Sequence, residues 1–210
     1  MEHDFWHERW ENDQIAFHEG RPNVLLEHHF DALNLSSGDK IFLPLCGKTV
    51  DIHWLMAQGL EVVGAELSEI AIKQLFVDVG MTPEVTESGP FKVYSAPQLT
   101  VFVGDIFHLT ADMLGPVAAV YDRAALVALP EDMRAKYSPH LVSMTNTAPQ
   151  LLITFDYDQS QMPGPPFAVP ETAVRALYGD AYTVDLLESV SVVGGLKKKT
   201  TATELIWKLS

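Results

Sequence analysis

Residues 41–48, IFLPLCGK, decide the fold of this chain. The apolar run 41–43 predicts a buried β-strand, and the Pro/Gly turn that ends it is followed by a helical pattern from Thr49. The next apolar run, 62–65, ends in the carboxylate of Glu66. A strand, a tight turn, a helix and a second strand that ends in an acid are typical of the sheet edge where a nucleoside binds.

The turn and Glu66 together indicate which kind of nucleoside the chain binds. An ionised Glu66 can accept hydrogen bonds from both hydroxyls of a ribose. The turn lacks the G-x-G-x-x-G spacing that brings backbone amides close to a pyrophosphate. A carboxylate that can bind the ribose, without a glycine-rich turn that binds phosphate, favours a nucleoside cofactor that has no phosphates. S-adenosylmethionine is the common cofactor of this kind. A nicotinamide-dependent oxidoreductase and a non-catalytic nucleoside-binding module are the alternatives.

Composition limits the class of protein. A length of 210 residues with 47% apolar residues predicts one domain, 1–210. Residues 1–35 are expected to be part of this domain as an N-terminal helical segment, and the aromatic residues described below suggest that it is a lid. The formal net charge of −14 argues against nucleic acid or a membrane as the partner. A single cysteine, Cys46, excludes an internal disulfide and fits a reducing compartment. Because no signal peptide or spanning segment is found, we expect a cytoplasmic protein.

Strand and helix patterns alternate along the chain. Strands are expected at 41–43, 61–66, 91–95, 99–103, 118–122, 151–155, 182–188 and 203–209, and helices at 22–33, 50–58, 69–79, 130–144 and 171–178. The β-α units and the terminal pair of strands predict an α/β fold, with a doubly wound, mostly parallel sheet and one antiparallel edge strand.

Ligands of such sheets bind at the carboxyl ends of the strands, so the residues just after each strand are candidates. We expect Glu66 to bind the ribose, and Asp105 with Ile106 to bind the adenine amine and ring. The turn from Leu45 to Gly47 should pass close to the methionine part of the cofactor.

An aromatic segment precedes the first strand. Trp6, Trp10 and Phe17 are spaced so that one helical face, or its continuation, could present all three. The segment is either a helix that packs on the sheet or a lid whose rings cover a cationic sulfonium. His3 and His7 share helical spacing, but no third ligand follows at a suitable spacing, so no metal site is expected.

Five motifs resemble the thiopurine S-methyltransferase family: WHERW at 6–10 with FH at 17–18, PLCGK at 44–48, VGAE at 63–66, DRAAL at 122–126 and PGPPF at 163–167. They occur in the family's order and cover essentially the whole chain. The PLCGK turn and the PGPPF loop are specific to that family rather than common to methyltransferases.

The resemblance implies a class I, Rossmann-like methyltransferase fold with a seven-stranded sheet. It also implies S-adenosylmethionine as cofactor, S-adenosylhomocysteine as product, and a cytoplasmic monomer. Cofactor contacts are expected at Trp6, Trp10, Phe17, Leu45, Gly47, Glu66, Asp105, Ile106 and Arg123, although animal enzymes carry serine at the position of Asp105. Substrate contacts are expected at Phe17, Arg123, Pro165, Pro166 and Phe167. The bacterial branch, which this chain resembles in length, is associated with methylating selenium and tellurium compounds as well as thiopurines.

The expected reaction is an in-line methyl transfer to the sulfur of an aromatic thiol, which requires no metal. Catalysis then depends on alignment and on exclusion of water. Arg123 is the expected catalytic residue, as a fixed charge that stabilises the thiolate. Asp122 is either a base or, the interpretation we favour, a residue that holds Arg123. Cys46 is expected to fill a tight strand-to-helix junction.

Overall fold

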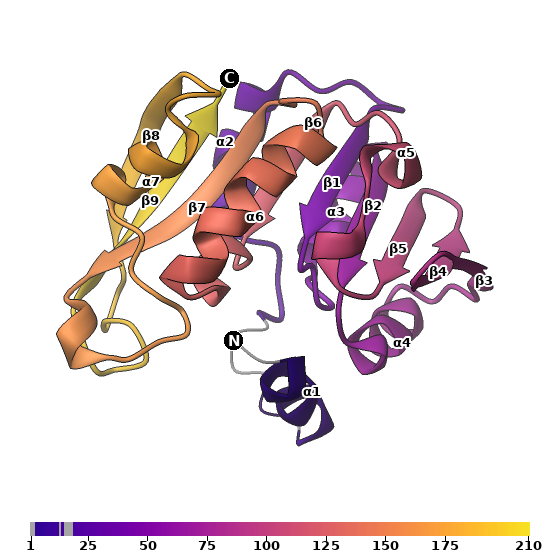
Figure 1. The fold of residues 1–210 in the computed structure, drawn as a ribbon, viewed down its shortest axis with the longest axis horizontal. Helices are drawn as coiled ribbons and strands as arrows, with labels where there is room; N and C mark the ends of the chain where they lie inside the picture. The colour runs from indigo at the N-terminus through magenta and orange to yellow at the C-terminus, as the bar shows by residue number, and fades with distance from the viewer. Residues whose placement is uncertain (1–2, 13, 15–18) are drawn as a thin grey trace.

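The computed structural model describes residues 3–12, 14 and 19–210 and shows alternating strands and helices (Figure 1). The strands are β1 Lys40–Pro44, β2 Glu61–Glu66, β3 Glu84–Ser88, β4 Phe91–Ala96, β5 Leu99–Val103, β6 Ala119–Arg123, β7 Gln150–Tyr157, β8 Val184–Ser191 and β9 Ala202–Leu209. The α-helices are α1 His3–Glu11, α2 Val24–His29, α3 Asp51–Ala57, α4 Glu69–Asp78, α5 Ala111–Leu114, α6 Glu131–Met144 and α7 Glu171–Tyr178. Short 3-10 helices are η1 Phe30–Leu33, η2 Ile106–His108, η3 Leu126–Ala128 and η4 Gln159–Gln161.

The strands form one sheet in the order β3-β4-β5-β2-β1-β6-β7-β9-β8. Strands β5, β2, β1, β6 and β7 pair in parallel, whereas β4 and β9 run antiparallel to their neighbours. The expected α/β fold class is therefore confirmed. The expected count of seven strands is wrong, because the sheet has 9 strands and the β3–β4 hairpin extends it beyond β5. The antiparallel strand β9 also lies one position inside the edge, with β8 outside it.

Strand β3 shows why the count differed. Its sequence, EVTES, is exposed at every position except the half-buried Ser88. A strand that buries no face lacks the alternation of apolar and polar residues by which strands are predicted. Two negative charges on this edge strand also discourage pairing with another chain.

Helices cover both faces of the sheet. Apolar side chains of α5, α6 and α7 pack into one core layer, and those of α2, α3 and α4 pack into the other. In Figure 1, α6 and α7 lie in front of the sheet, α2 and α3 lie behind it, and α1 lies beyond the carboxyl ends of β1 and β2. None of the helices among the described residues is long and apolar enough to cross a membrane.

Polar caps fix the helices that flank the first strand. The Asn23 side chain accepts hydrogen bonds from Leu25 N and Leu26 N, so α2 begins at this residue. The backbone N–H of Asn23 donates to Asp51 Oδ1 at 2.7 Å, and Tyr121 Oη donates to Asp51 Oδ2 at 3.1 Å. One buried carboxylate therefore joins the start of α2, the start of α3 and strand β6.

Cys46 packs against Gly64 of the neighbouring strand. A Cβ atom placed on Gly64 would lie 2.7 Å from Cys46 Sγ, so only glycine fits beside this thiol. Burial and the negative charge of Glu66 raise the pKa of the Cys46 thiol well above its ordinary value. Both observations agree with a residue that fills the junction rather than a nucleophile.

We predict that Gly64→Ala lowers the free energy of unfolding by about 1–3 kcal/mol, because the added methyl collides with Cys46 Sγ. In a Cys46→Ala background the same substitution should cost much less, since the colliding atom is gone. Urea denaturation of the four proteins in this cycle measures the coupling. Equal costs in the two backgrounds would contradict the packing described.

Candidate functional site

A cavity of about 500 Å³ lies at the carboxyl ends of the parallel strands. It is lined by most of the residues expected at a binding site: Trp6, Trp10, Leu45, Gly47, Glu66, Asp105, Ile106, Arg123, Pro165 and Pro166. Asp122 and Phe167 are not among its lining residues. Phe17, expected at both the cofactor and the substrate, lies outside the described residues. A second, more open hollow of about 530 Å³ lies between α4 and the β3–β4 hairpin and contains fewer of these residues.

Glu66 is buried at the end of β2 and connects two loops. Its Oε2 atom accepts the backbone N–H of Gly47 at 2.8 Å, and its Oε1 atom accepts that of Ser68 at 2.8 Å. Burial raises the pKa of the Glu66 carboxyl, and the backbone donors partly offset this. A carboxylate can accept about four hydrogen bonds, so Glu66 keeps acceptor capacity for a ligand hydroxyl beside its backbone donors Gly47, Ser68 and Leu67.

The turn after β1 is held in an unusual conformation beneath an aromatic ring. Leu45 has φ 46° and Gly47 has φ 52°, both in the left-handed region that favours glycine. A Cβ atom on Gly47 would lie 3.2 Å from Cζ2 of Trp10, so the indole of α1 packs directly on the turn. Trp10 is buried, and it joins the N-terminal helix to the strand-end site.

Asp105 and Ile106 form the next strand end, after β5. Asp105 Oδ1 accepts the N–H of Phe107 at 3.0 Å and so begins η2. The Ile106 side chain is buried, and both residues line the cavity. This part of the wall therefore offers a carboxylate acceptor beside an apolar surface, and the expected contact with adenine stays a prediction.

Arg123, at the end of β6, forms an ion pair with Glu19. The side chain of Arg123 is 14% exposed and that of Glu19 is 47% exposed, and both residues line the cavity. Sequence reasoning missed Glu19, because 104 positions separate the two residues and no local pattern marks such a pair. A carboxylate thus already contacts the cation that was expected to bind the substrate.

Asp122 is placed differently from both of its expected roles. Its Oδ2 atom accepts the hydroxyl of Tyr137 at 2.7 Å, and its Oδ1 atom accepts Leu126 N at 3.0 Å. Asp122 is fully buried on the side of α6, away from the cavity lining. Successive residues of a strand point to opposite faces, which separates its carboxylate from the guanidinium of Arg123. The expectation that Asp122 acts as a base or holds Arg123 is therefore not supported.

The Pro-rich loop contributes prolines to the cavity but not its aromatic ring. The hydroxyl of Tyr157 donates to Pro166 O at 2.6 Å, and Phe167 N donates to Val127 O at 2.7 Å. The ring of Phe167 covers Gly164, where an added Cβ would lie 2.5 Å from the ring. In this structure Phe167 packs within the loop and is not among the residues that line the cavity, so its expected contact with the substrate is not seen.

Three further cationic residues, which the sequence did not assign to a binding site, line the cavity: Arg9, Lys48 and Lys197. Lys197 Nζ donates to Pro165 O at 2.7 Å, although the 197–199 segment reads as a solvated hairpin tip. Burial, Arg9 and Lys199 together lower the pKa of the Lys197 ammonium. Within the described part of the chain, the buried Nε of Arg9 has no hydrogen-bond partner. Together with Arg123, these groups make part of the cavity wall positively charged.

Comparison with known proteins identifies relatives over the full length. A family model described as Thiopurine S-methyltransferase (TPMT) matches residues 1–208. A "Thiopurine S-methyltransferase" of Xanthobacter autotrophicus is 55% identical over 100% of this chain and 99% of its own length. One of Teredinibacter turnerae is 50% identical over 100% of this chain and 98% of its own.

Solved structures resemble this chain in fold. A Burkholderia thailandensis 1,6-didemethyltoxoflavin-N1-methyltransferase, crystallised with S-adenosylhomocysteine, has a TM-score of 0.66 at 13% identity and covers 99% of this chain and 87% of its own. The magnesium protoporphyrin IX methyltransferase of Synechocystis, also with S-adenosylhomocysteine, has a TM-score of 0.60 at 13% identity and covers 99% of each chain.

The Asp122 carboxyl provides a test of its structural placement. Burial raises its pKa from 3.8 to about 6. Because its pKa is higher in the folded than in the unfolded chain, Asp122 stabilises the fold at low pH and this contribution is lost as pH rises through about 6. Asp122→Asn cannot ionise. Its free energy of unfolding relative to the unmodified protein should therefore rise by about 1.4 kcal/mol between about pH 5 and pH 8.

Urea denaturation at both pH values measures this difference. Tyr137→Phe is the matched control, since it keeps the carboxyl and should keep a pH dependence of the same sign. A difference between Asp122→Asn and the unmodified protein that does not vary with pH would contradict the burial described.

Proposed function

We propose roles for the residues of the cavity on the premise that this chain belongs to the thiopurine S-methyltransferase family. The chain is accordingly an S-adenosylmethionine-dependent methyltransferase, and the oxidoreductase and non-catalytic alternatives are set aside. Its acceptor, in our proposal, is a flat aromatic thiol such as a thiopurine. The observation that carries this choice is a cationic group with little solvent exposure, Arg123, in a cavity that also has apolar wall residues such as Pro165 and Pro166.

The donors and acceptors of the cavity fit the cofactor. Glu66 keeps acceptor capacity on its carboxylate for the ribose hydroxyls, and Asp105 presents an acceptor for the adenine amine. Ile106 gives an apolar contact for the adenine ring. The buried Nε of Arg9 is a donor suited to the carboxylate of the methionine part. When bound, S-adenosylmethionine supplies a methyl group on a positively charged sulfur.

The remaining residues align the reactants and exclude water. Trp10, packed on the turn from Leu45 to Gly47, closes the cavity on the side of α1. Prolines 165 and 166, held by Tyr157, form an apolar wall for a flat ring. Reactants that are held in position in a dry site need no protein nucleophile.

Arg123 acts on the acceptor in this proposal. A guanidinium that is 14% exposed stabilises a thiolate more strongly than a solvated one, because little water competes for the charge. It therefore favours loss of the thiol proton to solvent before transfer. Glu19 competes for the same guanidinium, so binding of an anionic acceptor must displace or rearrange this ion pair.

A methyl-transfer assay with labelled S-adenosylmethionine tests the acceptor class. The panel comprises a thiopurine, a benzenethiol, an aliphatic thiol, selenite and tellurite. We expect kcat/KM for the two aromatic thiols to exceed that for the aliphatic thiol by at least about tenfold, since only a flat ring fills the apolar wall. Methylation of selenite or tellurite alone would contradict an aromatic thiol as acceptor.

Two substitutions separate the members of the ion pair. Arg123→Ala should lower kcat/KM for the aromatic thiol by about tenfold or more, because it removes the charge that stabilises the thiolate. Glu19→Gln should instead lower KM for the thiol, because it removes the competing carboxylate. Steady-state kinetics measures both. If Glu19→Gln reduced kcat/KM as strongly as Arg123→Ala, the pair would act as one unit and the competition would be disproved.

A further inference from the structure

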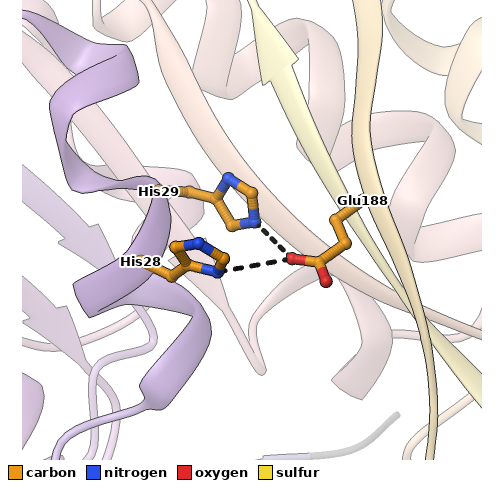
Figure 2. Close-up of side chains that lie close together, drawn as sticks. All are labelled: His28, His29 and Glu188. Atoms are coloured by element: carbon orange, nitrogen blue, oxygen red, sulfur yellow. Dashed lines mark hydrogen bonds and ion pairs between the residues drawn. The ribbon is translucent and has the colours of Figure 1, made fainter.

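A cluster of two histidines and a glutamate joins helix α2 to the edge strand β8, outside the cavity (Figure 2). We propose that His28, His29 and Glu188 form a binding site for a divalent transition metal ion of the zinc class. This site is independent of the methyl-transfer chemistry, because none of its three residues lines the cavity.

The three side chains already converge on one point. His29 Nε2 lies 2.7 Å from Glu188 Oε2, and His28 Nδ1 lies 3.6 Å from the same oxygen. One ligand atom from each residue lies within 4.8 Å of the others. Figure 2 shows both imidazoles directed at the carboxylate from neighbouring positions of α2. A tetrahedral site with bonds of about 2.0–2.2 Å separates its ligand atoms by about 3.3 Å, so only small side-chain rotations are needed.

An irregularity in β8 brings Glu188 to this face of the sheet. Before it, Leu186 pairs with Trp207, whose side chain belongs to the core layer of α6 and α7. After it, Glu188 pairs with Ile206, whose side chain belongs to the layer of α2. Because paired residues of antiparallel strands project to the same face, the extra residue Leu187 turns Glu188 toward α2. Without this bulge, strand alternation would place Glu188 on the opposite face.

The donor set is one that proteins use for zinc. Two imidazoles and one carboxylate, with a fourth position left for water, occur in zinc sites. The side chain of His28 is 71% exposed, so solvent and a metal ion can reach the cluster, whereas His29 is 16% exposed and holds a fixed position. In the described part of the chain, the ion-pair contacts of Glu188 are with these histidines and not with lysine or arginine. The net charge of −14 also favours the approach of a cation.

Sequence reasoning could not find this site. Adjacent histidines on a short helix are a common pattern, and 159 positions separate His29 from Glu188. The metal would connect the helix that precedes β1 to the C-terminal hairpin, so binding should stabilise the folded chain.

Titration of the chelator-treated full-length protein with Zn²⁺, by calorimetry near neutral pH, tests the proposal. We expect saturable binding of one ion per chain, and a rise in Tm with added Zn²⁺. Glu188→Gln should weaken binding by about tenfold or more and abolish the rise in Tm, because an amide is a poor zinc ligand. The variant keeps an oxygen that can accept from His29, so its circular dichroism and its methyl-transfer activity should match those of the unmodified protein.

Matched histidine variants decide whether binding occurs at this cluster. His29→Asn should abolish binding, whereas His108→Asn, at an exposed histidine elsewhere, should leave it unchanged. His7→Asn removes the helically spaced pair with His3 and should also leave it unchanged. Absence of saturable binding by the unmodified protein would overturn the proposal. So would Zn²⁺ binding with unchanged affinity in Glu188→Gln, or loss of binding in His7→Asn.

Discussion

Glu66 accepts one backbone N–H from the turn after β1 and one from the loop before α4, through its two carboxylate oxygens. The first of these bonds holds Gly47 in the position on which the indole of Trp10 packs. Removing the carboxylate would leave two buried donors unsatisfied, at a cost of about 1–3 kcal/mol each. The shape of the turn, the seat of α1 and the proposed ribose contact therefore all depend on one side chain.

The residues that line the proposed site carry both signs of charge. Carboxylates of Glu66 and Asp105 face the part assigned to ribose and adenine, whereas Arg123, Arg9 and Lys197 line the rest of the wall. In our proposal the carboxylates receive the hydroxyl and amine donors of the nucleoside, Arg9 binds the carboxylate of its methionine part, and Arg123 binds the anionic acceptor. The Glu19–Arg123 ion pair compensates the charge of Arg123 in this structure.

Much of this architecture could be predicted from local patterns. Strands β1 and β2 were recognisable because they are buried along almost their whole length and therefore consist mainly of apolar residues. The turn between β1 and α3 was recognisable because it contains a proline and a glycine. Strand β3 was missed because it buries no face. The partners of Arg123 and Asp122 were missed because they come from distant segments, and Glu188 faces α2 only through a bulge. The alternation of side-chain direction along β6 predicts that Asp122 and Arg123 point to opposite faces of the sheet, and this signal was available from the sequence.

Calorimetric titration with S-adenosylhomocysteine tests the central role of Glu66 most directly. Glu66→Gln preserves the shape of the side chain but removes its charge and one of its acceptor oxygens. We predict that it weakens binding by at least about tenfold, whereas Glu61→Gln, at the exposed start of the same strand, leaves affinity unchanged. A correctly folded Glu66→Gln protein that binds with unchanged affinity would contradict the account.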